Sequence, residues 1–382
     1  MQPVAGQPDV ETGTPRARAR ALRASLAAAP RAPWSFEGEL VGLGARLGRV
    51  ELAAEPGTLG DQPCWVVSER TVREHGAARV VSDSTLFLAP DLALLRSESA
   101  LRAPGGSSLL AMGWRDGRLE VHEEAGDEAR AAALDAPREA TSGLFALLAL
   151  ARALPAQDLA TPGVAWRLEV ADGRLAFGDD KGQPLPAGLA DVELTVVEGR
   201  AGGATLVLEG RAASGRALRL HLDRATRAVQ RIEGLVPALS IVPRGTPGLP
   251  PAPAWFARVG EPPQDALSAF VTFGRGYHLP RRDLLEAAFH WPSMRDHEVA
   301  AGTYPAGTAP ERVRDDFCAE FERMSKHRSE GDCDDLLVQL LLSATITTHA
   351  DGSVTVDTLP AYGDHAYTMA PRDGRWWIVR VD

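Results

Sequence analysis

The stretch Asp116-Gly-Arg-Leu-Glu-Val-His122 determines how this chain folds, because it joins a tight turn to an alternating strand. An Asp-Gly pair favours a type I′ turn, which needs positive φ at both of its central residues. After the turn, Leu119 and Val121 alternate with Glu120 and His122, so one face of the strand is apolar and the other is polar. The stretch therefore predicts a β-hairpin with one face in a core.

Three further Asp-Gly pairs occur, at Asp172-Gly173, Asp351-Gly352 and Asp373-Gly374. They lie on both sides of a proline-rich joint, which predicts one β-rich unit before the joint and another after it. A length of 382 residues suits two to three domains. We therefore divide the chain into an arm over residues 1–33, a β unit over 34–243, a linker over 244–261 and a final unit over 262–382.

The unit over residues 34–243 consists mostly of strands with one apolar face. Apolar and polar side chains alternate in segments such as Val50–Leu52, Trp166–Val170, Val192–Val196 and Leu218–Leu222. So many strands with one dry face predict a large antiparallel sheet, strongly curved or closed. We expect a curved antiparallel half-barrel.

One helix interrupts these strands. Ser142 is placed to cap its start, and Leu154-Pro155 ends it. The residues between them are apolar on most sides of a helix, so the helix should be buried rather than exposed. We expect it to cover the mouth of the curved sheet.

The segment Met1–Pro33 is basic and rich in alanine. It predicts either a helix or a disordered arm, and we favour the disordered arm. It contains no continuous apolar stretch, so no signal peptide is readable in it. The later segment Val242–Pro263 is rich in proline, which predicts a semi-rigid linker.

The unit over residues 262–382 begins with helices and ends with hairpins. Apolar stripes at helical spacing predict helices from Pro263, from Pro280 and over Glu311–His327. The run Leu336–Leu342 is a helix or a buried strand, which periodicity does not distinguish. Two hairpins follow, around the last two Asp-Gly pairs. This order predicts an α+β domain.

The composition argues against several classes of protein. The net charge of −10 and the isoelectric point near 5.5 argue against binding to nucleic acid, which needs a basic face. No apolar run reaches the roughly 18 residues of a transmembrane helix. The three cysteines, Cys64, Cys318 and Cys333, have no zinc-site spacing. Cys318 and Cys333 are either a disulfide or two buried free thiols, and we favour free thiols.

The chain ends with Met369–Asp382, which reads Met-Ala-Pro-Arg-Asp-Gly-Arg-Trp-Trp-Ile-Val-Arg-Val-Asp, and the final unit opens with Pro262–Phe270, which reads Pro-Pro-Gln-Asp-Ala-Leu-Ser-Ala-Phe. These segments resemble the terminal hairpin and first helix of nuclear transport factor 2-like (SnoaL-like) domains, over residues 262–382. The resemblance implies a cone-shaped α+β fold that serves as a binding or dimerising module. It implies no particular activity, because that fold carries isomerases, dehydratases and non-catalytic binders.

The first unit is similar to the half-barrel of outer-membrane lipoprotein carriers and of related envelope proteins of unknown function. The similarity rests on the strand pair Gly48–Ala54 and Cys64–Arg73, the segment Val81–Arg96 and the helix end Ala153–Pro155. It implies a lipid, an acyl chain or another apolar ligand held between a curved sheet and a covering helix, in the periplasm or cell envelope. The absence of a readable signal peptide is a departure from that pattern.

Candidate catalytic residues lie in the final unit. The resemblance to nuclear transport factor 2-like enzymes implies a cone-shaped pocket, where burial tunes a carboxylate or imidazole for proton abstraction. In that interpretation Asp296 or His297 is a base, Tyr304 or Tyr367 is a hydrogen-bond donor, and His365 is a further candidate. The alternative, which we favour, is a set of polar residues on a loop between helices.

Nothing in the sequence predicts a bound metal or cofactor. His290, His297 and His365 lack the spacing of zinc ligands. No serine lies in a Gly-x-Ser-x-Gly sequence, and no glycine-rich segment has the pattern of a phosphate-binding loop.

Candidate ligand-binding residues of the first unit are Trp65, Trp114, Trp166 and Phe177. On strands these aromatic residues belong to the core, or they line an apolar pocket if the helix leaves one. The leading hypothesis is a non-catalytic binding protein of the bacterial cell envelope that holds an apolar ligand or a protein partner in the half-barrel. The alternatives are an isomerase or hydrolase-like enzyme that uses the C-terminal cone, and a purely structural envelope protein.

Overall fold

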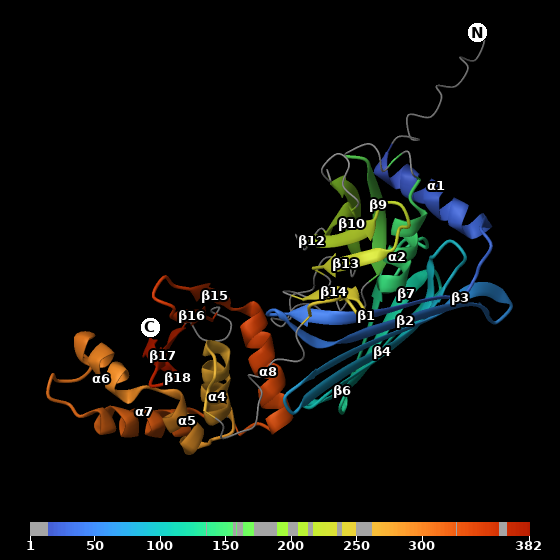
Figure 1. The fold of residues 1–382 in the computed structure, drawn as a ribbon. Helices are drawn as coiled ribbons and strands as arrows, with labels where there is room; N and C mark the ends of the chain where they lie inside the picture. The colour runs from blue at the N-terminus through green and yellow to red at the C-terminus, as the bar shows by residue number, and fades with distance from the viewer. Residues whose placement is uncertain are drawn as a thin grey trace, which may run out of the picture.

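The computed structural model describes residues 14–134, 136–155, 158, 163–171, 189–197, 205–212, 217–234, 239–249, 262–325, 327–358 and 365–382. Two units lie end to end, one built on a large sheet and the other rich in helices (Figure 1). The hairpin expected at Asp172-Gly173 lies outside the described residues, and so does Phe177.

The first unit is built on one antiparallel sheet of 14 strands. The strands are β1 (Trp34–Gly42), β2 (Ala45–Leu59), β3 (Gln62–His75), β4 (Ala78–Leu88), β5 (Leu94–Ala103), β6 (Gly106–Arg115), β7 (Arg118–Ala125), β8 (Glu128–Leu134), β9 (Ala165–Ala171), β10 (Leu189–Val197), β11 (Thr205–Ala212), β12 (Ala217–Asp223), β13 (Val229–Glu233) and β14 (Ser240–Pro243). Their order in the sheet is β8-β7-β6-β5-β4-β3-β2-β1-β14-β13-β12-β11-β10-β9. Among the described strands β8 and β9 are the edges and do not pair, so the sheet is not a closed barrel.

The turn between β6 and β7 has the geometry that the sequence predicts. Its central residues Asp116 and Gly117 have φ of 48° and 84°. The last hairpin of the chain repeats this, with φ of 50° at Asp373 and 79° at Gly374. Leu119 and Val121 on β7 are fully buried, so the alternation also identifies the core face correctly.

The hairpin around Asp351-Gly352 is present, but its turn differs from the other two. Only Gly352 has a positive φ, at 81°. The Asp351 carboxylate accepts hydrogen bonds from the N–H and hydroxyl groups of Ser353, at 3.0 and 2.7 Å. These side-chain hydrogen bonds stabilise the turn. The loop of this hairpin is longer than the two residues of a type I′ turn.

Helix α2 (Gly143–Ala153) is buried against this sheet, as the sequence predicts. Its apolar side chains share one core with residues from both halves of the sheet, including Leu86 on β4 and Leu220 on β12. The sheet therefore curves around α2, whose apolar side chains share the core with both of its halves (Figure 1).

A carboxylate of the sheet caps the start of α2. Glu69 on β3 accepts a hydrogen bond from the Phe145 N–H at 2.8 Å. Burial raises the pKa of Glu69, and the hydrogen bonds from the backbone of α2 offset this only in part. Gly143 has φ of 84°, and a Cβ atom there would lie 2.7 Å from Glu69 Oε1. Glycine is therefore required where the helix approaches the carboxylate.

The segment over residues 140–142 connects the two halves of the sheet. The Leu94 N–H on β5 donates to the carbonyl of Ala140, and the Thr141 N–H donates to the carbonyl of Glu169 on β9, both at 2.8 Å. The hydroxyl of Ser142, the predicted cap, donates to the last carbonyl of β9 at 3.0 Å and makes no capping bond to α2. The cap comes from Glu69 instead.

The described part of the arm is a helix, α1 (Pro15–Ala28). Thr14 caps it, and Leu22 is buried in the core of the first unit. The Arg23 guanidinium donates to the backbone carbonyls of Asp91, at 3.0 Å, and of Glu139. We favoured a disordered arm, and this prediction is wrong over residues 15–28, which form a helix packed against the first unit.

The final unit has helices α4 (Ala266–His278), α5 (Arg282–Ala288), α6 (Trp291–Ala300), α7 (Pro310–Met324) and α8 (Glu330–Ser343). A sheet of four strands follows, β15 (Thr345–Thr348), β16 (Val354–Asp357), β17 (Ala366–Arg372) and β18 (Arg375–Val381), paired in that order. The run Leu336–Leu342 belongs to a helix.

We expected Asp296 and His297 on a loop between helices, but the structure has a helix there, α6. It carries Asp296 and His297, and His290 caps it by accepting a hydrogen bond from the Ser293 N–H. Met294 is its one buried residue. A helix with so little apolar surface shows no stripe at helical spacing, which explains why its sequence does not predict it.

The helices and the small sheet enclose a second core. Phe270, Phe289 and Ile378 are buried in it. Cys318 and Cys333 are buried in the same core as free thiols, which is the alternative that we favoured. Burial raises their pKa to about 11 and about 12, so neither is a reactive thiolate at neutral pH.

The two units meet at the start of α8. Asp334 is completely buried and accepts two hydrogen bonds from the Arg275 guanidinium on α4, at 2.8 and 2.7 Å. It also accepts one from the Ala77 N–H, in the turn between β3 and β4, at 2.7 Å. The neighbouring Asp335 lies 3.4 Å from the His75 ring on β3. A hairpin of the first unit is thereby attached to a helix of the second.

Within the described residues, no helix is both long enough and apolar enough to cross a bilayer. The class predicted from the sequence is confirmed in outline. A large antiparallel sheet comes first, and most of the helices come after it.

Candidate functional site

A cavity of about 530 Å³ lies between the helices of the final unit and its sheet. Side chains of α4, α7, α8 and β17 line it, together with residues 328, 358 and 365. Small-molecule sites have volumes of roughly 300–1,000 Å³. The cavity therefore has the size of a ligand site.

The wall of this cavity is aromatic. Phe270, Phe273, Tyr277, Phe321 and Tyr367 line it. Phe273 lies at the centre of the group, with ring centroids 5.4 Å from Phe321 and 5.1 Å from Tyr367. Tilted and edge-to-face arrangements at such distances are the favourable ones for aromatic rings. The wall is thus a packed surface that offers ring faces and edges to an apolar guest.

A glycine brings the two helices of this wall together. Gly274 on α4 faces Leu337 on α8, and a Cβ atom on Gly274 would lie 2.2 Å from Leu337 Cδ2. Leu337 is buried, and its side chain would have to shift to admit a Cβ atom at this distance. The small residue therefore sets the separation of α4 and α8, and with it the width of the cavity.

The aromatic wall contains two tyrosines, Tyr277 and Tyr367, whose phenol groups are polar. Burial, and next the nearby Tyr277, raise the pKa of Tyr367 to about 12. Tyr367 consequently stays protonated at neutral pH and acts as a hydrogen-bond donor rather than as a base. The Tyr277 hydroxyl, nearer the surface, donates to the carbonyl of Met324 at 3.3 Å.

The rim of the cavity carries basic side chains and an exposed methionine. His278, Arg328 and His365 all line the cavity. Arg328 and His365 are exposed, and Met324 is 44% exposed, which is high for a large apolar side chain. Flexible methionines at a surface are typical of apolar binding sites.

The structure does not bring the predicted catalytic residues together. His365 and Tyr367 line the cavity. Asp296 and His297 lie on α6, where the Asp296 side chain is 67% exposed and the His297 ring lies 3.2 Å from the carbonyl of Val381. None of the predicted base residues on α6 lines the cavity.

Tyr304 has a structural contact instead. Its hydroxyl donates to the Asp316 carboxylate at 3.3 Å, which ties the segment after α6 to α7. Burial and this carboxylate raise the pKa of Tyr304. Tyr362 and Asp364, which precede His365 in the sequence, lie outside the described residues. The described part of the chain holds no group of three or more His, Cys, Asp or Glu residues arranged to bind a metal ion.

The tryptophans of the first unit lie in or beside its core. Trp166 is 1% exposed. Trp65 packs against Phe145 of α2, with centroids 5.6 Å apart. Trp114 donates its N–H to the carbonyl of Leu94 at 2.7 Å. They contribute to the core that contains α2.

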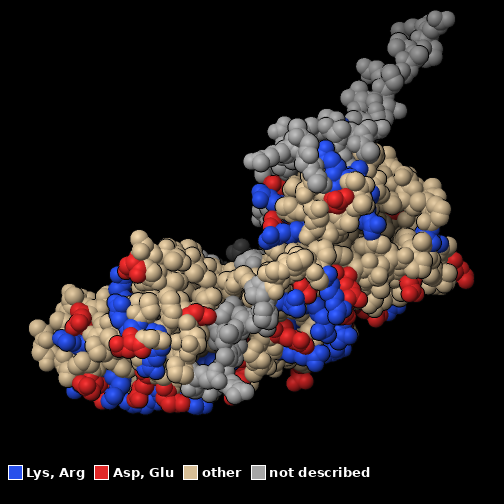
Figure 2. All heavy atoms as spheres, viewed as in Figure 1, with Lys and Arg blue, Asp and Glu red and all other residues tan. Residues whose placement is uncertain are grey.

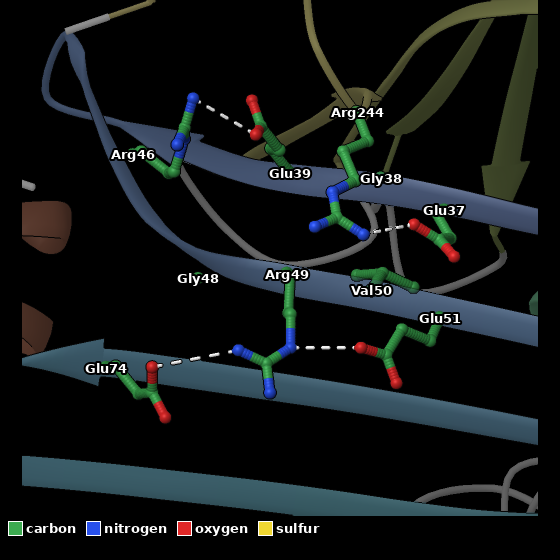
Figure 3. A pocket seen from close by; sticks show the side chains of 10 residues that line it. All are labelled: Glu37, Gly38, Glu39, Arg46, Gly48, Arg49, Val50, Glu51, Glu74 and Arg244. Atoms are coloured by element: carbon green, nitrogen blue, oxygen red, sulfur yellow. Dashed lines mark hydrogen bonds and ion pairs between the residues drawn. The ribbon is translucent and has the colours of Figure 1, made fainter. Parts of the chain in front are cut away.

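A second hollow, of about 310 Å³, lies on the first unit over β1 and β2 (Figure 3). Arginines and glutamates face one another across it. The pairs are Arg46 with Glu39 at 3.0 Å, Arg49 with Glu51 at 3.0 Å and Arg244 with Glu37 at 2.5 Å. Because these charges already neutralise one another, the hollow presents little unpaired charge to a ligand. Figure 2 shows the same mixture of basic and acidic side chains across the visible surface.

No protein-family model matches the chain, and no curated protein matches it. Among solved structures, the chain is similar to a β-barrel-like protein of domain of unknown function DUF1849 from Brucella abortus. The identity is 9%, the match covers 55% of this chain and 94% of that chain, and the TM-score is 0.32. At that TM-score the likeness is too weak to assign the chain to a family.

The sequence does not identify the aromatic wall as a site. Phe270 and Phe321 occur in apolar stripes that predict the buried faces of helices, and both faces are indeed covered. Periodicity identifies the covered face of a helix but not whether neighbouring side chains fill the space beside it. Arg328, between two helices, carries no signal in the sequence that distinguishes it from other surface arginines.

Proposed function

We propose that this chain is a non-catalytic binding protein that holds an apolar small molecule in the aromatic cavity of its final unit. The observation that carries the proposal is a space of about 530 Å³ enclosed by five aromatic side chains, with an exposed methionine at its rim. Apolar walls with a few polar groups are typical of sites that bind ligands by burial of surface.

The polar groups of the cavity support binding rather than catalysis. No aspartate or glutamate is among its described lining residues. Burial raises the pKa of Tyr367 to about 12, so this side chain is a neutral phenol at neutral pH. A general base must reach the proton that it removes, and the predicted bases Asp296 and His297 are elsewhere. Of the predicted imidazoles only that of His365, at the exposed rim, lies beside the cavity. The enzyme hypothesis is therefore the weaker one for this cavity.

We infer that the final unit has the nuclear transport factor 2-like arrangement that its sequence resembles. Helices followed by an antiparallel sheet, with a cavity between them, support this inference. A dimer formed through this unit stays a prediction. A lipid in the half-barrel and a place in the cell envelope also stay predictions.

The test is binding of a neutral fluorescent probe, N-phenyl-1-naphthylamine, to the full chain. We expect a dissociation constant of roughly 1–100 μM, given typical binding energies per ligand atom. Leu336→Trp, on the cavity wall, should abolish binding because the indole occupies the space. Leu109→Trp, at an exposed position on β6, is the matched control and should bind like the wild type.

Circular dichroism and thermal melting would show that both variants fold. Wild-type protein that does not bind the probe would contradict the proposal. So would equal binding by wild type and a folded Leu336→Trp. If binding instead survived Leu336→Trp and disappeared in Trp65→Ala, the site would be in the half-barrel.

A further inference from the structure

We propose that the molecule held in the aromatic cavity is an amphipathic anion, with its apolar body against the aromatic wall and its negative group at Arg328. This proposal rests on the binding function proposed above and adds the chemical class of the ligand. It follows from the charges around the cavity, the pairing of Arg328 and the position of the buried aromatic rings.

The charge around the cavity differs from that of the chain. The chain has 51 acidic residues against 41 lysines and arginines. The described lining of the cavity nevertheless has one guanidinium, two imidazoles and no carboxylate. Guanidinium and imidazole N–H groups are hydrogen-bond donors, and a guanidinium binds carboxylates, phosphates and sulfonates in a planar, two-point geometry. The rim therefore favours an anionic group over a cationic one.

Arg328 is available for such a contact. Other arginines of the unit are already in ion pairs, such as Arg281 with Asp283 at 2.5 Å and Arg312 with Asp316 at 2.8 Å. Among the described residues that line the cavity with Arg328, none is an aspartate or glutamate. Its backbone N–H donates to the carbonyl of His278 at 3.0 Å, which fixes its backbone beside the rim.

The acidic residues nearest to Arg328 in sequence have another role. Glu330 and Asp332 lie in the first turn of α8, where carboxylates favour the helix start. The Asp332 carboxylate accepts a hydrogen bond from the Ser329 hydroxyl at 2.5 Å. The Asp332 carboxylate is thereby held at the helix start and, among the described residues, is not part of the cavity lining that contains Arg328.

The cavity has an apolar end and a polar end. Phe270, Phe273 and Leu337 are at most 6% exposed, whereas Arg328 and His365 are exposed. A ligand that enters with its apolar body first reaches the aromatic rings and leaves its charged group at the rim. Little charge is then desolvated, so the ion pair strengthens binding without the cost of a deeply buried charge.

The experiment compares two probes that share one aromatic body. N-phenyl-1-naphthylamine is neutral, and 8-anilinonaphthalene-1-sulfonate carries a sulfonate. We expect the full chain to bind the sulfonate more tightly, and Arg328→Gln to weaken that binding by about tenfold, as expected for a charge-assisted hydrogen bond. The neutral probe should change by less than about twofold. Arg323→Gln, at an exposed position of α7, is the matched control and should change neither affinity.

The outcomes separate the two proposals. If neither probe binds the wild type, both proposals are wrong. If the neutral probe binds and is excluded by Leu336→Trp, but Arg328→Gln leaves the sulfonate affinity unchanged or weakens both probes equally, the binding function stands and the anionic ligand is wrong. A loss confined to the sulfonate probe in Arg328→Gln, with Leu336→Trp excluding both, supports both.

Discussion

Ionisation of Glu69 lowers the stability of the folded chain, because the charged carboxylate is buried. Its carboxylate accepts the hydrogen bond from the Phe145 N–H that the start of α2 needs, yet burial raises its pKa above the ordinary value. A glutamate with a raised pKa binds a proton more tightly in the folded chain than in the unfolded chain. Its contribution to stability is therefore greatest in acid and falls as the pH rises.

We predict that Glu69→Gln changes the pH dependence of stability. The amide keeps an acceptor for Phe145 and carries no charge, so the stability of the variant relative to wild type should improve as the pH rises from about 4 towards 8. The change begins near pH 4.5, the ordinary pKa, and is complete above the raised pKa of Glu69. Urea unfolding at a series of pH values would measure it.

Two further variants separate the effect of the Glu69 charge from the effect of its hydrogen bond. Glu69→Leu also removes the charge but removes the acceptor as well, so it should be less stable than Glu69→Gln by about 1–3 kcal/mol at every pH, because the Phe145 N–H loses its partner. Glu98→Gln, on β5 with its side chain 47% exposed, is the control and should show little effect. If the curves of Glu69→Gln and wild type ran parallel, the assigned role of burial at Glu69 would be wrong.

Among the helices, the contact of α4 with α8 depends on the absence of one side chain. We predict that Gly274→Ala lowers the free energy of unfolding of the final unit by about 1 kcal/mol. The better helix propensity of alanine, worth about 1 kcal/mol, is outweighed by the clash with Leu337, since overpacking a core costs about 1–3 kcal/mol. Thermal and urea unfolding would measure it.

A double-mutant cycle would test the cause of that loss. In the Leu337→Ala background, Gly274→Ala should be neutral or stabilising, which gives a favourable coupling of about 1 kcal/mol. Gly307→Ala, where a Cβ atom meets nothing within 4 Å, is the control for alanine itself. A coupling energy of zero would mean that Leu337 does not limit the approach of the two helices.

The elements that the sequence predicts best are those whose signal is local. The residues that specify the turn at Asp116-Gly117 lie in the turn itself, and the residues that specify α2 lie in its own apolar run. Helix α6 does not, because only Met294 is buried, and the run Leu336–Leu342 is ambiguous without the cap at Ser329. The cap of α2 cannot be predicted from nearby residues either. Glu69 is 76 residues from Phe145, and only the folded sheet brings the two together.

At the scale of the molecule, Asp334 is one of the residues that join the two units, and it is the most deeply buried charged one. We predict that Asp334→Asn destabilises the final unit by roughly 3–5 kcal/mol, because the Arg275 guanidinium, 7% exposed, then lacks its counter-charge. The hydrogen bond from the Ala77 N–H should weaken as well. Urea unfolding would give the loss of stability, and small-angle scattering would report whether the two units separate.

Asp283→Asn is the matched control for this substitution. It removes a carboxylate from another arginine pair, Arg281 with Asp283, whose side chains are 46% and 60% exposed. An exposed pair contributes about 0–1 kcal/mol, so this variant should be close to wild type. A similar loss in both variants would show that burial of the Asp334 pair has no special effect.

The candidate site belongs to this largest scale, which explains why the sequence does not predict it. The aromatic residues of the wall come from α4, α7 and β17. Tyr367 was predicted as a candidate donor, but the phenylalanines occur in stretches that read as ordinary core. The cavity exists because these elements meet without filling the space between them. That property depends on distances between elements, and no local pattern of residues records it. His365 was predicted from its residue type, and Arg328 was not.

The attachment of the β3–β4 turn to Asp334 has a practical consequence for work with this protein. Hairpin turns at a surface are ordinarily the safest places to insert a tag, a label or a foreign loop. The turn at Gly76-Ala77 is an exception, since its backbone is bonded to the other unit. The turn at Asp116-Gly117 is suitable, because nothing lies within 4 Å of a Cβ atom built on Gly117. An insertion there leaves the junction of the two units intact.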